Sequence, residues 1–178
     1  MPLALPAHIE TERLTFRLPE PEDAETIFEA YCQDAEVCRF LVWLPHDSVN
    51  VTRDFIASCM AAVEDGSAVP YVLTLKDSGR VVGMVEARPL QLRINIGYVL
   101  ARAYWGRGLM SEAVLALSHA ALSGSFYRVE AACDVDNRAS ARILEKSGFA
   151  REGRLSRYMV LPGISPEPRD AFLYAVHR

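Results

Sequence analysis

Residues 94–111, Ile-Asn-Ile-Gly-Tyr-Val-Leu-Ala-Arg-Ala-Tyr-Trp-Gly-Arg-Gly-Leu-Met-Ser, change from the pattern of a strand to the pattern of a helix. Gly106 and Gly108, which lack a Cβ, flank Arg107 at the junction. Before the junction, apolar side chains alternate with the period of a β-strand: Ile94, Ile96, Tyr98 and Leu100. After it, they recur with the spacing of one helix face: Met110, Ala113, Val114, Leu117 and Ala121. The stretch therefore predicts a strand, a tight glycine turn and a helix.

The start of this helix is a candidate anion-binding site. A helix N-terminus carries N–H groups without intrahelical acceptors and a partial positive charge, and Arg107 adds a formal charge. A Gly-x-Gly turn before a helix is nevertheless common, and the phosphate-loop motif and the three-glycine dinucleotide fingerprint are both absent. The interpretation as a pyrophosphate cradle thus stays beside that of an ordinary turn. The candidate cradle consists of Trp105, Gly106, Arg107, Gly108, Leu109, Met110 and Ser111.

The composition is that of an ordinary globular domain. With 178 residues, 51% hydrophobic and 24% charged, the chain is long enough for one domain over residues 1–178. A net charge of −4 argues against a nucleic-acid partner. The sequence contains no apolar run long enough to span a membrane and no basic segment typical of a signal peptide. We therefore expect a cytoplasmic protein without a membrane partner.

The four cysteines show no paired spacing. We expect them to be reduced, mostly buried thiols, as is usual in a cytosolic protein. Their spacing and that of the four histidines also argue against a zinc site, so no metal is expected. The residues concerned are Cys32, Cys38, Cys59, Cys133, His8, His46, His119 and His177.

The remaining pattern places the glycine turn in a mixed α/β sequence. A strand–helix–strand unit over 94–133 predicts a parallel pair within an otherwise antiparallel sheet. Elsewhere we expect strands at 14–18, 71–75, 81–85, 149–158 and 171–176, helices beginning at Pro21 and after Ser48, a helix capped by Asp136 or Asn137 and ending at Gly148, and a proline-rich loop at 161–169.

Three separated segments carry a family resemblance. Residues 105–110 occupy the position of the signature Gln/Arg-x-x-Gly-x-Gly/Ala, in which Gly108 matches and Trp105 and Met110 depart. Residues 128–149 contain an Asn-x-x-Ser helix start and a Glu-Lys-x-Gly-Phe helix end, and residues 12–17 with 22–24 supply a first strand and helix. Together they resemble the GNAT N-acetyltransferases, in the branch that acetylates ribosomal-protein N-termini and that often has Tyr-Trp-Gly-Arg/Lys-Gly in its turn.

The resemblance implies a fold and a cosubstrate. The implied fold is the acyl-CoA N-acyltransferase fold, a twisted mixed sheet of six to seven strands with about four helices, splayed at its parallel pair. Acetyl-CoA would lie in the split and donate its acetyl group to a primary amine, on a ribosomal or other protein N-terminus or on a small molecule. The protein would be a monomer or a homodimer. The sequence does not identify the acceptor.

The resemblance also implies roles for individual residues. The backbone of Tyr98, Val99 and Leu100 would bind the pantetheine arm. Asn137 would bind that arm, cap its helix, or do both. Ser140 would protonate the departing thiolate, because Leu144 stands where many members have a tyrosine; alternatively it is a first-turn serine bonded to its own backbone.

The general base is the least determined residue. Glu86 lies near the end of a predicted strand that should neighbour the split, although a surface glutamate is the alternative. His46, Glu152 and Tyr158 are further candidates without a distinguishing feature. His119 lies opposite the apolar stripe of its helix, so we expect it to face solvent.

Three functions remain in competition. The first is an acetyl-CoA-dependent N-acetyltransferase, and the second is a non-catalytic acyl-CoA-binding module on the same fold, which Leu144 and the lack of a clear base favour slightly. The third is a phosphate-binding regulatory domain, which would bind simple nucleotides without preferring CoA. Steady release of CoA thiol in the presence of an amine separates the first function from the other two.

Overall fold

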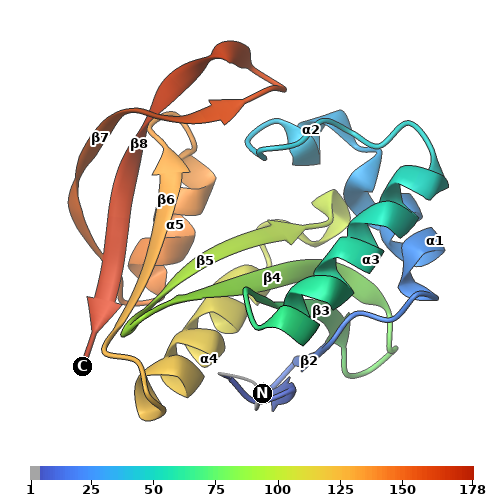
Figure 1. Ribbon diagram of the computed structural model, residues 1–178, viewed down its shortest axis with the longest axis horizontal. Coiled ribbons are helices and arrows are strands. Elements are labelled where there is room, and N and C mark those ends of the chain that lie inside the picture. Colours follow the sequence, from blue (N-terminus) through green and yellow to red (C-terminus); the bar gives the residue numbers. More distant parts are fainter. Residues whose placement is uncertain (1–4) are drawn as a thin grey trace.

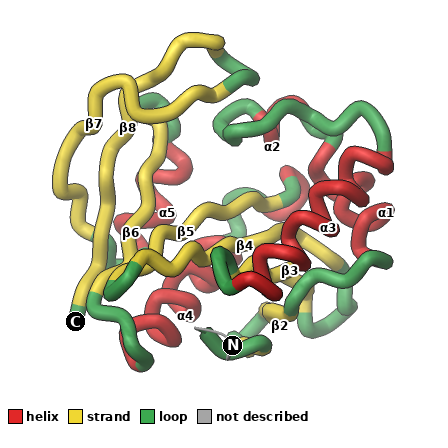
Figure 2. The backbone as a smooth tube through the Cα atoms, viewed as in Figure 1, coloured by secondary structure: helices red, strands yellow, loops and turns green. Residues whose placement is uncertain are grey.

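The computed structural model describes residues 5–178 and shows one mixed sheet with helices on both faces (Figures 1 and 2). Residues 1–4 of the predicted domain lie outside the described part. They include the start of the N-terminal segment in which no signal peptide was expected. The strand order is β1-β2-β3-β4-β5-β6-β8-β7. The strands are β1 (His8–Glu10), β2 (Leu14–Arg17), β3 (Val69–Leu75), β4 (Val81–Leu90), β5 (Arg93–Leu100), β6 (Arg128–Asp134), β7 (Ala150–Leu161) and β8 (Ser165–His177).

The helices cover the two faces of the sheet as two separate groups. They are α1 (Asp23–Ile27), α2 (Ala35–Cys38), α3 (Val49–Asp65), α4 (Leu109–Ser123) and α5 (Arg138–Lys146), with a π-helical turn at Phe28–Cys32 and a 3₁₀ turn at Arg102–Tyr104. Strand alternation decides which side chains meet which group. Val85 and Tyr98 contribute to the core under α4 and α5. Met84 and Val99 contribute to the core under α1 and α3.

The predicted parallel pair is confirmed, since β5 and β6 are parallel whereas every other pair of neighbouring strands is antiparallel within residues 5–178. Helix α4 makes the connection. The predicted α/β class with a mixed sheet is also confirmed, although the described residues form eight strands and five α-helices, slightly more than expected. The additional β1 and α2 have three and four residues, which is too short for a periodic pattern to show.

The predicted loop at 161–169 is wrong, because β8 already begins at Ser165 and only a short turn separates it from β7. Up to Asp170, β8 pairs with β7 alone; its pairing with β6 begins at Ala171. Pro166 and Pro168 are two residues apart, so their missing N–H groups face the same side of the strand. Prolines are tolerated where one side of a strand has no neighbour.

Several local predictions meet a definite outcome. Asn137 caps α5 by accepting from the Ser140 N–H, at 3.1 Å, and Gly148 follows the helix with φ of 84°. Ser48 stands at the cap position of α3, but its side chain makes no capping bond. All four cysteines are free and buried, as predicted. Among residues 5–178 no helix is long and apolar enough to cross a membrane.

Candidate active site

The centre of the sheet is split between β5 and β6. The two strands pair only through Arg93–Asn95 and Arg128–Glu130 and then diverge, so that they open as a V in Figure 1. Beyond Asn95, β5 keeps β4 as its neighbour on one side, with Gly83 opposite Leu100. Its backbone groups on the other side face the split. This places the backbone of residues 98–100 where an extended amide-bearing chain can hydrogen-bond to it.

The glycine turn lies between β5 and α4, at the open end of the split. Gly106 and Gly108 both have φ of 76°, the left-handed region that glycine adopts without a steric penalty. Helix α4 begins at Leu109, and the first bond into its first turn runs from the Glu112 N–H to the Gly108 carbonyl at 3.0 Å. The N–H groups of residues 109–111 therefore have no intrahelical acceptor.

The side chains of the turn divide into buried anchors and exposed groups. Leu109 and Met110 are buried in the core, so only their backbone is available to an anion. Trp105 is half-exposed, and its Nε1–H donates to the Leu100 carbonyl at 2.7 Å, which ties the turn to the end of β5. The Arg107 guanidinium lies over the Tyr104 ring, 5.3 Å from its centre. The turn thus presents backbone N–H groups and one exposed cation to the same region.

A pair of hydroxyl groups connects β5 with α5. The Tyr98 phenol oxygen lies 2.7 Å from Ser140 Oγ and 3.4 Å from the Ser140 carbonyl. The backbone of Ser140 is already bonded to Asn137, so its side chain is free to face Tyr98. The interpretation of Ser140 as a serine bonded only to its own backbone is therefore not what the structure shows. The sequence did not reveal the phenol of Tyr98 as its partner.

The surroundings of this pair keep its protons in place. Burial raises the pKa of Tyr98 well above its ordinary value, and the Ser140 hydrogen bond opposes this only in part. Burial also raises the pKa of Cys133 to about 11, an effect that Ser140 opposes only in part. Leu144, one helical turn further along α5, is fully buried and offers no proton donor. At neutral pH the pair is protonated and can donate.

Glu86 lies on the other face of the sheet. It is in β4 opposite Gly97, whereas Tyr98 is opposite Val85 and therefore faces the α5 side. Both Glu86 carboxylate oxygens accept from Arg88, at 3.1 Å from Nε and 2.6 Å from Nη2, and Arg88 Nη1 also donates to Asn95 at 3.3 Å. The Glu86 side chain is about one third exposed. Glu86 is thus a partly exposed carboxylate paired with Arg88 on the α1 and α3 side of β4.

The other candidate bases are engaged elsewhere or exposed. His46 is buried; its Nδ1 lies 2.8 Å from Thr52 Oγ1, and burial lowers its pKa. Glu152 accepts from Arg128, which holds the pKa of that carboxyl below its usual value, at the end of β6 where the split is closed. Tyr158 and His119 are exposed, the latter as predicted. None of these four side chains hydrogen-bonds to Ser140 or Tyr98 among the described contacts.

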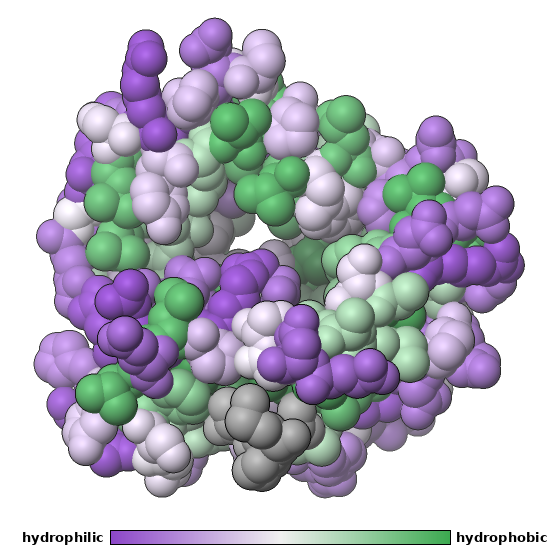
Figure 3. Space-filling view, viewed as in Figure 1, coloured by the Kyte–Doolittle hydropathy of each residue, from purple (hydrophilic) through white to green (hydrophobic). Residues whose placement is uncertain are grey.

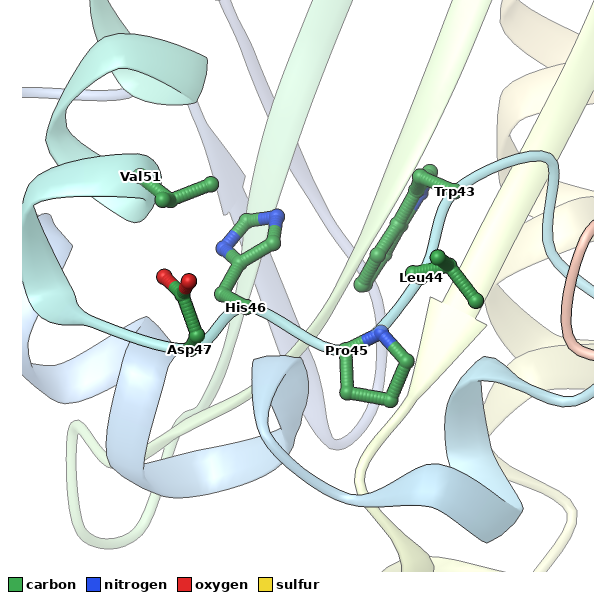
Figure 4. Close-up of a pocket in the computed structure, with 6 residues that line it drawn as sticks. All are labelled: Trp43, Leu44, Pro45, His46, Asp47 and Val51. Atoms are coloured by element: carbon green, nitrogen blue, oxygen red, sulfur yellow. The ribbon is translucent and has the colours of Figure 1, made fainter.

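The β7–β8 hairpin and the loop that follows α2 meet above the split in the view of Figure 1, and we call this pair of segments the roof. A Cβ on Gly163, in the β7–β8 turn, would lie 3.2 Å from the Arg39 carbonyl, so this turn touches the chain that follows α2. Figure 3 shows the molecule hollowed at its centre, between this roof and the strands below. Beside it opens a pocket of about 320 Å³, drawn in Figure 4, where the Trp43 ring lies 5.0 Å from that of His46. The pocket is lined by Trp43, Leu44, Pro45, His46, Asp47 and Val51.

The site therefore has two sides. The glycine turn, Tyr98 and Ser140 lie toward α4 and α5, and Glu86 and the Trp43 pocket lie toward α1 and α3. Within residues 5–178 no cluster of three or more His, Cys, Asp or Glu side chains is arranged to hold a metal ion.

Comparison with known proteins identifies the family. A family model described as an acetyltransferase (GNAT) domain matches residues 13–150. The chain is 33% identical over 152 residues to the uncharacterized N-acetyltransferase p20 of Bacillus licheniformis. The aligned region covers 83% of this chain and 85% of that protein. The chain belongs to the GNAT acetyltransferase family, and its predicted activity as an N-acetyltransferase is confirmed at this level.

Two further similarities concern the predicted branch. The ribosomal-protein-serine acetyltransferase of Escherichia coli (strain K12) is 28% identical over 133 residues, covering 68% of this chain and 73% of that protein. The structure of RimL, a ribosomal L7/L12 alpha-N-protein acetyltransferase in complex with coenzyme A, superposes with a TM-score of 0.83 at 23% identity and covers 96% of this chain and 97% of that one. The resemblance to this branch is confirmed.

Proposed function

We propose that this protein transfers the acetyl group of acetyl-CoA to a primary amine by direct attack. The observation that carries the proposal is the Tyr98–Ser140 hydroxyl pair at the open end of the β5–β6 split, beside a glycine turn that begins a helix. The turn supplies N–H groups for the diphosphate, and the free edge of β5 supplies partners for the pantetheine amides. The complex of RimL with coenzyme A supports this cosubstrate.

The chain's own groups have complementary roles in the reaction. Backbone N–H groups of β5 that face the split polarise the thioester carbonyl. The neutral amine attacks the carbonyl carbon, the carbon–sulfur bond breaks, and the thiolate takes a proton from Ser140. Tyr98 replaces that proton through their 2.7 Å contact and regains one from solvent. The products are the amide and the free thiol of CoA.

The amine must also lose a proton. Glu86 lies in β4 opposite Gly97, on the α1 and α3 side of the sheet, and Arg88 holds its carboxylate in position. We assign it the role of proton acceptor, directly or through a water molecule. A protein N-terminus, with a pKa well below that of a lysine side chain, is an acceptor that is easier to deprotonate. The ribosomal-protein acetyltransferase among the relatives supports an N-terminal acceptor.

The test is the release of CoA thiol from acetyl-CoA by the purified protein, with and without a panel of short peptides and small amines. We expect release that depends on an acceptor with a free amine and stops when its N-terminus is blocked. Binding of acetyl-CoA is measured separately by calorimetry, so that a panel without an active acceptor still gives a result. Tight binding of acetyl-CoA without turnover of any acceptor would favour the non-catalytic acyl-CoA-binding module, and absence of CoA binding would contradict the proposal.

A further inference from the structure

The loop between β1 and β2 reaches the glycine turn. The Arg13 side chain donates from Nε to Glu112 Oε2 at 2.7 Å and from Nη1 to the Arg107 carbonyl at 2.9 Å. The Arg13 backbone N–H and the Thr11 hydroxyl both donate to Glu112 Oε1, at 2.9 and 2.6 Å. Arg13 Nη2 would lie 3.6 Å from a Cβ on Gly108. One guanidinium therefore joins the first turn of α4 to the middle of the glycine turn.

This contact restrains a peptide that is otherwise weakly fixed. The peptide between Arg107 and Gly108 ends at a glycine with φ of 76°, and Gly106 on the other side of Arg107 has the same φ. Glycine allows the backbone the widest choice of conformations. A peptide unit is planar and trans, so its N–H points opposite to its carbonyl. By holding the Arg107 carbonyl, Arg13 directs the Gly108 N–H away from itself. A rotation of this peptide would present a carbonyl oxygen where an anion requires a donor.

The same contact also balances a charge. Glu112 is an acidic residue in the first turn of α4, close to the N–H groups that would receive a diphosphate. Burial opposes its ionisation, but hydrogen bonds from Thr11 and Arg13 lower its pKa, so it is a carboxylate at neutral pH. An unpaired carboxylate there would repel an anionic ligand, and the Arg13 guanidinium pairs with it at 2.6 Å.

We propose that Arg13 is a positioning residue for the cradle, which it holds in the conformation that binds the CoA diphosphate. The inference rests on the proposed function, since it concerns how the turn is prepared for that ligand. Arg13 acts through the Arg107–Gly108 peptide and Glu112, with which its Nε, Nη1 and Nη2 atoms are already in contact. The effect of its loss is therefore expected in ligand affinity and in the mobility of the turn, and not in the chemical step.

The experiment compares Arg13→Ala, Arg13→Lys and a control, Arg53→Ala, with the wild type. Arg53 pairs with Glu25 on the exposed surface of α3, remote from the turn in the fold. Calorimetry with CoA is expected to show a dissociation constant raised about tenfold in Arg13→Ala, as for the loss of a hydrogen bond to a charged group. Amide exchange of residues 106–108 without ligand is expected to quicken, and kcat at saturating acetyl-CoA to stay within about twofold. The control is expected to match the wild type.

A double variant separates the two effects of Arg13. If charge balance alone mattered, Glu112→Gln would restore the affinity of Arg13→Ala; we expect the double variant to stay weak, because the Arg107 carbonyl is still released. Where Arg13→Ala does not fold, Arg13→Lys serves instead, since a lysine reaches Glu112 or the carbonyl but lacks the planar fork that reaches both.

The outcomes are distinct. An unchanged dissociation constant and unchanged exchange in Arg13→Ala, with tight binding by the wild type, would overturn this inference alone. An equal loss in Arg53→Ala would show a general loss of stability and overturn it as well. Failure of the wild type to bind CoA would overturn the proposed function, and the inference with it.

Discussion

Replacing Ser140 by alanine tests the proton donor while leaving the surrounding structure in place. The cap of α5 uses the backbone N–H of Ser140, so Asn137 keeps its 3.1 Å bond in the variant. The hydroxyl that is lost is the one that faces Tyr98. We therefore expect α5 to remain folded and the departing thiolate to lose its nearest donor.

The magnitude follows from what remains at the site. General acid catalysis is worth about 10²-fold or more, and the buried Leu144 offers no donor in its place. We expect kcat to fall about 100-fold, which is about 2.7 kcal/mol of transition-state stabilisation, while the KM for acetyl-CoA changes little. Tyr98→Phe should cost about tenfold, the net worth of one hydrogen bond. Because Tyr98 acts through Ser140, the double variant should be no slower than Ser140→Ala.

The assay is steady-state release of CoA thiol, measured with a chromogenic disulfide and an active acceptor. Ser58→Ala is the matched control, since Ser58 is a helical serine whose hydroxyl bonds to its own backbone, at 2.9 Å from the Asp54 carbonyl. Leu144→Tyr in the Ser140→Ala background should restore part of the rate. Full activity of Ser140→Ala per folded molecule would refute the role of Ser140 as proton donor. If the rate loss in the double variant were the product of the two single losses, the claim that Tyr98 acts through Ser140 would be refuted.

Three further predictions concern the cradle, the cap and the thiols. Gly108→Val should weaken acetyl-CoA binding at least tenfold, roughly 1.4 kcal/mol, because Gly108 has φ of 76° and its backbone must approach the diphosphate; unchanged calorimetry in a folded variant would contradict this. Asn137→Ala should raise the KM for acetyl-CoA more than it lowers kcat, and it should lower the melting temperature through the lost cap; a change in kcat alone would contradict it. Burial raises the pKa of each cysteine to about 11 or 12, so few thiolates form at pH 8 and a thiol reagent should label the native protein slowly. Titration after unfolding without a reductant should count four thiols, and a count of two or none would be contrary evidence.

The glycine turn, α4 and the ends of α5 could be predicted from the sequence because each depends on residues that are close together along the chain. Gly106 and Gly108 stand where the period changes from that of a strand to that of a helix, and the structure has the turn and α4 there. Asn137 and Gly148 mark the two ends of α5 by their preferred backbone conformations. These features depend on neighbouring residues along the chain, so no tertiary contact was needed to predict them.

The candidate site was readable only in part, because its partners are distant in sequence. Ser140 was found by its motif, but its contact with the phenol of Tyr98 bridges 42 positions and depends on how far β5 and β6 diverge. Arg13 and Glu112 are 99 positions apart, and Arg13 read simply as part of a first strand. The ion pair of Glu86 with Arg88 was not predicted, although residues two apart in a strand share a face.

The central claim is that the split between β5 and β6 holds acetyl-CoA with its thioester beside Ser140. A crystal structure of the protein with CoA or acetyl-CoA tests this most directly. We expect the diphosphate at the N–H groups of residues 106–111, the pantetheine arm along the free edge of β5, and the sulfur within about 4 Å of Ser140 Oγ, the range of a hydrogen bond to sulfur. A ligand bound outside the split, or a sulfur atom turned away from Ser140 and Tyr98, would contradict the account.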